Sequence, residues 1–141
     1  MRKLLLLLIF GLIPSLAGLA PGNRVQYIPA GVKIKPLERL WWATCMVESS
    51  NDPKAYNRIE QATGIVQIRP IRLRDYNRRT GKGYKLKDCY DPKISKEIFL
   101  YYARKYHYSD YETIARSWNG RGKQTLKYWD KIKKQLLTIK N

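Results

Sequence analysis

A segment that is apolar on most sides of a helix, residues 37–47, sets the strongest limit on the fold. Its apolar side chains follow one another at helical spacings: Leu37, Leu40, Trp41, Ala43 and Val47. This spacing predicts a helix that is buried on most of its circumference. Such a helix has to be covered by other elements, so the sequence predicts a folded core and not a disordered chain.

Glu48 lies at the C-terminal end of this predicted helix. The partial negative charge of a helix C-terminus and desolvation by the neighbouring Trp and Met side chains both raise the pKa of a carboxyl group. A glutamate that keeps its proton near neutral pH is suited to act as a general acid. A solvent-exposed glutamate at a helix end is the plain alternative, and for a lone glutamate it is the commoner case.

Four short segments, in a fixed order along the chain, favour the catalytic interpretation. They are Glu48-Ser49-Ser50 with the polar loop at 51–53, Gly64-Ile65-Val66-Gln67-Ile68, the Tyr101-Tyr102 pair after Asp91-Pro92, and Ser117-Trp118-Asn119-Gly120. Together they resemble the motifs of the lytic transglycosylases, peptidoglycan-cleaving relatives of goose-type lysozyme. That family carries Glu-Ser, a Gly-Leu-Met-Gln-Ile-like segment, a tyrosine-bearing helix and an Ala-Tyr-Asn-Ala segment. The resemblance extends from about Leu37 to Asn119.

The resemblance implies a mainly α fold, a single lysozyme-like helical domain of the goose type, and a reaction that needs one carboxyl group. Glu48 would protonate the glycosidic oxygen of the β-1,4 bond between MurNAc and GlcNAc. As a carboxylate it would then take the proton of the muramic C6 hydroxyl, which closes onto C1 and leaves a 1,6-anhydroMurNAc end. No cofactor and no metal is expected. Ser49, Gln67, Tyr102 and Asn119 are the expected substrate-binding residues.

Glu60 is the candidate for a second carboxylate, because it lies in the loop four residues before Gly64. Glycosidases that use water usually employ two carboxyl groups, so a lysozyme-type hydrolase with Glu48 and Glu60 is the alternative reaction. A solvated loop glutamate is the plain interpretation of Glu60. A catalytically silent wall-binding component of an envelope-spanning assembly is another alternative, and such a protein would tolerate the loss of Glu48.

The first twenty residues have the layout of a secretory signal: a basic start, a Leu/Ile-rich run and then small residues. Cleavage is expected after Ala17 or Ala20, which places the protein in the periplasm or cell envelope. An uncleaved membrane anchor is the alternative, but the apolar run is short and Pro14 interrupts it. The predicted organisation is therefore a signal peptide over 1–20, an irregular lead-in over 21–35 and the transglycosylase domain over 36–141.

The chain is strongly basic, with a formal net charge of +17. A protein of this charge favours an anionic partner. Export argues against nucleic acid, so the expected partners are peptidoglycan glycan strands and an anionic envelope polymer, or a secretion, conjugation or phage assembly. A monomer is expected. A cationic nucleic-acid- or membrane-binding protein is the alternative from another class, and its binding would be indifferent to the Glu48 carboxyl.

Two cysteines, Cys45 and Cys89, lie beyond the predicted signal peptide. An exported chain meets an oxidising compartment, so we expect a disulfide between them. Two small buried residues are the alternative. With His107 as its one histidine, the chain is unsuited to a zinc site or a Ser-His-Asp triad.

The helical pattern predicts four or five helices with little strand. The first follows Pro36 and ends near Glu48, and a short one after Gly64 would present Gln67. The later ones begin at Asp91-Pro92, at Ser109 or Asp110, and at a Thr125 cap, the last running to about Ile139. Four residues of this last helix are expected to face inward: Leu126, Trp129, Ile132 and Leu136. We expect that helix to be a structural clasp and not part of the site.

Overall fold

The computed structural model describes residues 36–105 and 110–139. The predicted signal peptide and lead-in, residues 1–35, lie outside the described residues. The elements in chain order are α1 (Pro36–Ser49), β1 (Tyr56–Asn57), β2 (Ala62–Thr63), α2 (Pro70–Thr80), the 3-10 helix η1 (Leu86–Tyr90), α3 (Pro92–Lys105), α4 (Tyr111–Asn119) and α5 (Gln124–Thr138). Five α-helices and one antiparallel hairpin within these ranges confirm the predicted mainly α fold.

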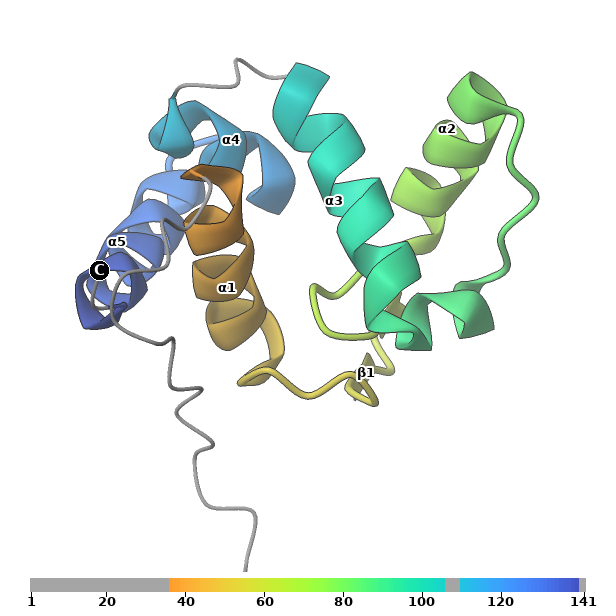
Figure 1. The fold of residues 1–141 in the computed structure, drawn as a ribbon, viewed down its shortest axis with the longest axis horizontal. Helices are drawn as coiled ribbons and strands as arrows, with labels where there is room; N and C mark the ends of the chain where they lie inside the picture. The colour runs from red at the N-terminus through yellow and green to blue at the C-terminus, as the bar shows by residue number, and fades with distance from the viewer. Residues whose placement is uncertain (1–35, 106–109, 140–141) are drawn as a thin grey trace, which may run out of the picture.

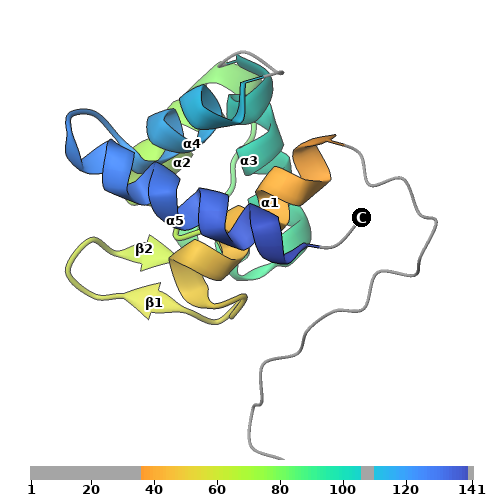
Figure 2. The same cartoon turned by 90° about the vertical axis from the view of Figure 1, so that its left-hand side faces the viewer.

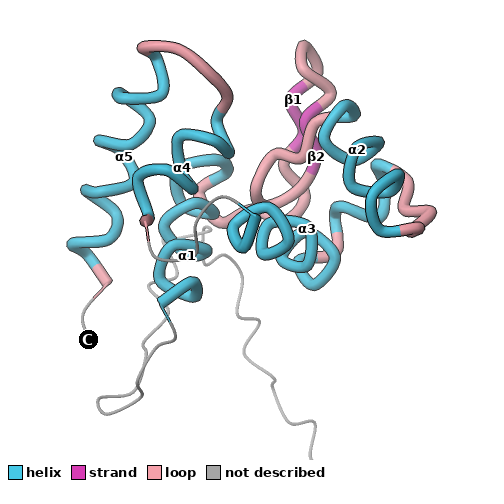
Figure 3. The backbone as a smooth tube through the Cα atoms, turned by 90° about the horizontal axis from the view of Figure 1, so that it is seen from above, coloured by secondary structure: helices cyan, strands magenta, loops and turns pink. Residues whose placement is uncertain are grey.

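The helices form two groups that meet at α3 (Figures 1 and 3). Helices α1, α4 and α5 pack against one another, and α5 lies along both α1 and α4 (Figure 2). Helix α3 contacts α1 and α4 on one side and η1 on the other. The hairpin packs through β2 against η1 and lies near the C-terminal end of α1 (Figure 2). No helix in the described ranges is long and apolar enough to cross a bilayer.

Helix α1 is buried on most of its circumference, as its apolar spacing predicts. Leu40, Ala43 and Cys45 have no exposed surface, and Trp41 is 4% exposed. The ring of Phe99 on α3 lies 5.5 Å from that of Trp41 and 5.2 Å from that of Trp118 on α4. Edge-to-face contacts of this kind add to the free energy of burying aromatic rings. They join three helices at the centre of the core.

Helices α3 and α4 begin where the capping pattern predicts. Helix α3 starts at Pro92, and the Asp91 carboxylate accepts a backbone N–H from its first turn at 2.8 Å. Asp110 caps α4 by accepting the backbone N–H of Glu112 at 3.0 Å. These caps satisfy backbone donors that a helix leaves unpaired at its N-terminus.

The predicted short helix after Gly64 is wrong. Residues 64–67 form a turn that is closed by Thr63 and Ile68, whose backbone groups exchange hydrogen bonds of 3.0 and 2.9 Å. Gly64 has a φ of +79°, and a Cβ there would lie 2.0 Å from the Cys89 carbonyl oxygen. Gln67 also has a positive φ, of 50°. Left-handed backbone at both ends of the segment is incompatible with a right-handed helix.

The predicted Thr125 cap and inward face of α5 need correction. The helix begins at Gln124, and the Thr125 hydroxyl donates to the Gly122 carbonyl at 2.7 Å instead of accepting a backbone N–H as a cap does. Of the four residues expected to face inward, Ile132 is buried and Trp129 and Leu136 are partly buried against the core, whereas Leu126 is 46% exposed. The buried residues of this helix are Thr125, Tyr128 and Ile132. The inward face of the helix therefore includes Tyr128 and excludes Leu126.

The predicted disulfide between Cys45 and Cys89 is not formed in the structure. Both are free thiols with no exposed surface. Cys45 lies on α1, which packs against α3, α4 and α5, whereas Cys89 lies on η1, which packs against α3 and β2. Burial raises the pKa of both thiols, that of Cys89 to about 12. Each therefore acts as a small buried residue, since the thiolate is the reactive form of cysteine.

Candidate active site

The last turn of α1 presents the partly buried Glu48 side chain to a polar pocket. The pocket contains two carboxylates, two guanidinium groups, two side-chain amides and one indole. Its lining residues are Glu48, Glu60, Gln67, Arg69, Arg72, Trp118 and Asn119. They come from α1, the hairpin loop, the turn before α2, α2 itself and α4, so the pocket exists only in the assembled fold.

Tyr128 on α5 donates a hydrogen bond from its hydroxyl to Oε1 of Glu48 at 2.8 Å. The tyrosine is 7% exposed and is eighty residues from Glu48 in the sequence. Sequence reasoning missed this residue because it treated the last helix as a clasp. Its position in the helical repeat with Thr125 and Ile132 was the available signal.

Burial raises the pKa of Glu48 from 4.5 to about 7. The Tyr128 hydrogen bond and the positive charges of Arg69 and Arg72 oppose this rise, while the negative charge of Glu60 adds to it. Desolvation is therefore the largest effect, and it favours the neutral acid. A pKa raised toward neutral pH suits a group that both donates and accepts a proton.

Glu60 lies in the same pocket but is paired with Arg69. The Arg69 guanidinium contacts Oε2 of Glu60 at 3.0 Å, and both side chains are nearly half exposed. An exposed pair of this kind contributes about 0–1 kcal/mol to folding. Its more direct effect here is to offset the Glu60 charge at the rim of the pocket.

Arg72 is fixed between two aromatic rings. Its Nη2 donates to the backbone carbonyl of Trp118 at 2.6 Å. Its Cζ lies 4.2 Å from the centroid of the Trp118 ring and 5.0 Å from that of Tyr102. Trp118 is only 5% exposed, so its ring supports Arg72 more than it offers an open face to a sugar. Neither Arg69 nor Arg72 was singled out from the sequence as a pocket residue.

The two pocket amides come from the predicted motifs. Gln67 donates from Nε2 to the Gly64 carbonyl at 3.0 Å and to the Ala55 carbonyl at 3.3 Å. These bonds hold the side chain in place on a left-handed residue, a backbone conformation that costs about 1–3 kcal/mol. Asn119 is the last residue of α4, and its side chain also lines the pocket. Both amides can bind hydroxyl and N-acetyl groups.

Two predicted site residues lie away from the pocket lining. The Ser49 hydroxyl donates to the Ile65 carbonyl at 2.8 Å and accepts the backbone N–H of Asp52 at 3.0 Å. It therefore ties the end of α1 to the turn that carries Gln67. The Tyr102 hydroxyl donates to Oδ2 of Asp75 at 2.8 Å.

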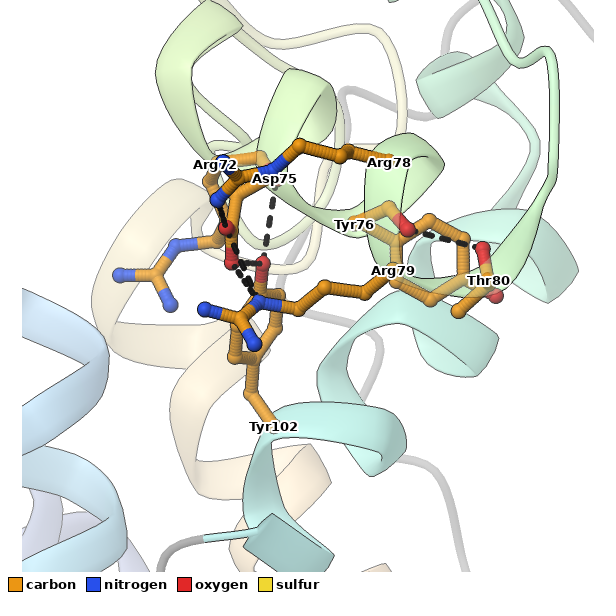
Figure 4. A network of polar contacts seen from close by, with 7 residues as sticks. All are labelled: Arg72, Asp75, Tyr76, Arg78, Arg79, Thr80 and Tyr102. Atoms are coloured by element: carbon orange, nitrogen blue, oxygen red, sulfur yellow. Dashed lines mark hydrogen bonds and ion pairs between the residues drawn. The ribbon is translucent and has the colours of Figure 1, made fainter.

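Figure 4 shows the cluster around Asp75. Arg78 and Arg79 reach the Asp75 carboxylate at 2.7 and 2.8 Å, whereas the Arg72 side chain extends away from it. Hydrogen bonds from Arg79, Arg78 and Tyr102 hold the pKa of Asp75 well below its usual range. Tyr102 thus bonds to α2 and provides one of the two rings that contact Arg72, and the tyrosine hydroxyl next to Glu48 comes from α5 instead of α3.

The pocket offers proton transfer and polar binding. No cluster of three or more His, Cys, Asp or Glu side chains suited to a metal ion occurs within 36–105 and 110–139. Glu48 supplies a carboxyl group with a raised pKa, and the Tyr128 hydroxyl donates to it. The amides and Arg72 supply fixed groups for the polar substituents of a ligand.

A protein-family model described as the transglycosylase SLT domain matches residues 30–139. The matched range includes all five α-helices and every residue that lines the pocket. No curated protein and no solved structure matches the chain significantly.

Proposed function

Because the chain belongs to the transglycosylase SLT family, we propose that it is a peptidoglycan lytic transglycosylase in which Glu48 alone serves as acid and base. A peptidoglycan-cleaving role of this general type follows from the family. The observation that carries the finer proposal is the environment of Glu48. Its carboxyl is desolvated, hydrogen-bonded to Tyr128 and has a pKa of about 7.

In the first step Glu48 acts as the acid. It gives its proton to the glycosidic oxygen between MurNAc and GlcNAc, and the bond from that oxygen to C1 of MurNAc breaks. The carboxylate that remains is stabilised by the Tyr128 hydrogen bond and by the positive charges of Arg69 and Arg72. Groups already oriented toward the developing charge lower the barrier of such a step.

In the second step the Glu48 carboxylate acts as the base. It takes the proton of the C6 hydroxyl of the same MurNAc, and O6 forms a bond to C1. The products are a 1,6-anhydroMurNAc end and a free GlcNAc hydroxyl, and Glu48 is protonated again. No water is consumed. A pKa of about 7 supports both roles, because proton transfer is most effective when the pKa is near the working pH.

Lysozyme-type hydrolysis is the second candidate, and the place of Glu60 in the pocket favours it. A carboxylate in that position would activate water for attack on C1. The ion pair with Arg69 engages Oε2 of Glu60 at 3.0 Å, which favours transglycosylation because this oxygen already has a partner other than water. The two reactions differ in their products and are therefore easy to separate.

Mass spectrometry of the fragments released from purified peptidoglycan tests the proposal. The wild-type protein and Glu60→Gln are expected to release fragments with 1,6-anhydroMurNAc ends, and Glu48→Gln is expected to release none. Reducing ends that disappear in Glu60→Gln would establish hydrolysis. Absence of release by every protein would favour the silent wall-binding component.

We also propose that the protein acts in the periplasm or cell envelope, with residues 1–20 as its signal peptide. A row of exposed lysines at the N-cap of α5 and along this helix supports an anionic envelope polymer, or an envelope-spanning assembly, as an additional partner: Lys123, Lys127, Lys131 and Lys134. N-terminal sequencing of the protein recovered from the envelope fraction should begin at Gly18 or Pro21. An intact Met1 terminus in that fraction would indicate an uncleaved anchor.

A further inference from the structure

The outer face of α5 carries exposed leucines among its lysines. The helix packs against α1 and α4 with its inner face, where Thr125, Tyr128 and Ile132 are buried (Figure 2). On the outer face, Leu137 is 85% exposed and Leu126 is 46% exposed. These leucines are separated by close to three turns of helix, so they lie on the same side and about 16 Å apart along the axis. Single exposed leucines are common on protein surfaces, so their neighbours decide what this pair indicates.

The neighbours of the two leucines are mostly positive. Asp130 is the one acidic residue of α5, and its carboxylate pairs with Lys133 at 2.8 Å. Glu112 on α4 also acts on Lys133 through space, but it is paired with Arg116 at 3.0 Å. The exposed lysines of the outer face number five, and with Asp130 they give it a net charge of +4: Lys123, Lys127, Lys131, Lys133 and Lys134.

The helical repeat places lysines on both sides of the leucine pair. Viewed down the axis at 3.6 residues per turn, Lys133 lies on one side of Leu126 and Leu137, and Lys123 and Lys134 lie on the other. Trp129, which is partly buried, borders the same face, and the Lys133 ammonium lies 5.8 Å from the centroid of its ring. The face therefore combines apolar side chains, a tryptophan edge and a surrounding positive charge.

This combination matches the surface of a bilayer better than it matches an anionic polymer. Lysine ammonium groups can contact lipid phosphates while leucines reach the acyl boundary beneath them, and tryptophan is favoured at the same depth. A polymer dissolved in water would use the lysines and leave the leucines exposed. We propose that the outer face of α5 binds the surface of a membrane that contains anionic lipids.

The inference goes beyond the proposed function and does not depend on it. The inner face of α5 carries Tyr128, whose hydroxyl donates to Glu48. The outer face is on the other side of the helix, so membrane binding there uses none of the residues that line the pocket.

Flotation with lipid vesicles tests the inference on the protein in the form recovered from the envelope fraction. One set of vesicles contains phosphatidylcholine alone, and the other contains equal parts of phosphatidylcholine and phosphatidylglycerol. We expect the wild-type protein to bind the anionic vesicles about a hundredfold more tightly than the neutral ones, at about fivefold for each lysine that meets the surface. Added salt should weaken this preference.

The contribution of the lysines is measured by a variant that combines Lys127→Gln, Lys131→Gln and Lys134→Gln. Its affinity for anionic vesicles should fall by about a hundredfold. The matched control removes the same charge by glutamine substitution of three exposed lysines outside α5: Lys54, Lys87 and Lys93. Its affinity should fall by less than about fivefold, because charges distant from the membrane are screened by salt.

The contribution of the leucines separates a membrane from a polymer. Leu126→Ser combined with Leu137→Ser should lower the affinity for anionic vesicles by about tenfold, because the apolar surface of two leucines stays in water. The same variant should bind immobilised polygalacturonate as the wild-type protein does. Ile59→Ser combined with Ile71→Ser is the control, since both isoleucines are exposed and lie outside α5, and it should keep its affinity for the vesicles.

A fluorescent label reports contact with lipid directly, whatever else holds the protein to the vesicles. Cys45 and Cys89 have no exposed surface, so an environment-sensitive thiol reagent should react with the introduced cysteine of Leu137→Cys. Its emission should shift to the blue on anionic vesicles. The same label on Ile71→Cys, at an exposed position on α2, should show no shift.

Three results would each overturn the inference. They are equal losses in the two lysine variants, full vesicle affinity after loss of both leucines, and an unshifted label at position 137. Binding to polygalacturonate without binding to anionic vesicles would also overturn it and assign the face to a polymer. Thermal melting checks that each variant is folded, and the wild-type comparison and the label decide the question for any that is not. None of these outcomes bears on cleavage, which the peptidoglycan assay tests separately.

Discussion

Two carboxyl groups of this protein have similar partners and opposite pKa shifts. Glu48 accepts a hydrogen bond from the Tyr128 hydroxyl at 2.8 Å, and Asp75 accepts one from the Tyr102 hydroxyl at the same distance. Each also has two arginines nearby. Yet the pKa of Glu48 is raised to about 7, whereas that of Asp75 is held well below its usual range.

The two carboxyl groups differ in their solvation and in whether arginines contact them directly. Glu48 is desolvated at the end of a buried helix, and the arginines in its pocket act on it through space. Asp75 lies on the surface of α2, where Arg78 and Arg79 bond to it directly. Hydrogen-bond partners alone therefore do not identify a catalytic carboxyl. Burial decides which of the two keeps its proton at neutral pH.

Substitution of the two carboxyl groups should have its largest effect on activity. Glu48→Gln should lower kcat for peptidoglycan cleavage by about a thousandfold, in the range that general acid–base catalysis contributes. Asp75→Asn should change kcat by less than about twofold, because Asp75 lies outside the pocket lining. Release of soluble fragments from labelled peptidoglycan measures both. A Glu48→Gln protein with a tenth of the wild-type rate would refute the role of Glu48.

The next effect is on stability. The pKa of Glu48 is higher in the folded protein, so its stabilising contribution is complete below pH 4.5 and is lost as the pH rises to about 7. The loss corresponds to about 3 kcal/mol. Glu48→Gln lacks this loss, so its advantage in unfolding free energy over wild type should be larger at pH 8 than at pH 5. Urea unfolding at the two pH values measures the difference, and an equal advantage at both would contradict burial as the cause.

A smaller effect is expected when each tyrosine loses its hydroxyl. The Tyr128 hydrogen bond favours the Glu48 carboxylate, so Tyr128→Phe should raise the pKa of Glu48 further. The basic limb of the kcat/KM profile, which reports the acid in the free enzyme, should then move up by about one unit. Tyr102→Phe keeps the ring under Arg72 and should leave that limb in place. Equal shifts in both variants would show that the hydroxyl at Glu48 has no special effect.

The smallest effect is expected for the stability of Asp75→Asn. The pKa of Asp75 is lowered by folding, so its contribution is present above pH 3.8 and is lost as the pH falls through the depressed value. Since the site is largely solvated, the variant should lose about 1 kcal/mol or less at pH 7. The loss should become smaller as the pH falls below 3.8. A loss that grows at low pH would have the wrong sign for a depressed pKa.

The sequence predicted the helix that ends near Glu48 and much of the pocket lining because those features are local. Glu48 follows a run of apolar residues at helical spacings, and Gln67, Asn119 and Glu60 lie within or beside short motifs. The pocket brings these four together. The turn at 64–67 was mistaken for a helix because its left-handed backbone depends on the contact between Gly64 and Cys89, which lies in a distant segment.

The remaining site residues depend on packing between distant helices. The bond between Tyr128 and Glu48 requires α5 to lie along α1, and the helical repeat of Tyr128 with Thr125 and Ile132 does not reveal which helix covers that face. The position of Arg72 depends in the same way on Trp118, forty-six residues away. The Tyr102 hydroxyl, expected near the acid, instead bonds to Asp75 because α3 places it beside α2.

The hydrogen bond between Tyr128 on α5 and Glu48 on α1 also determines when, during synthesis, the site can form. A ribosome makes Glu48 before it makes Tyr128, and α1 has no α5 to lie against until residues 124–138 have emerged. A chain that ends before Tyr128 therefore has Glu48 without the hydroxyl that donates to it. The site for which we propose cleavage is complete only after α5 has been made and has packed against α1.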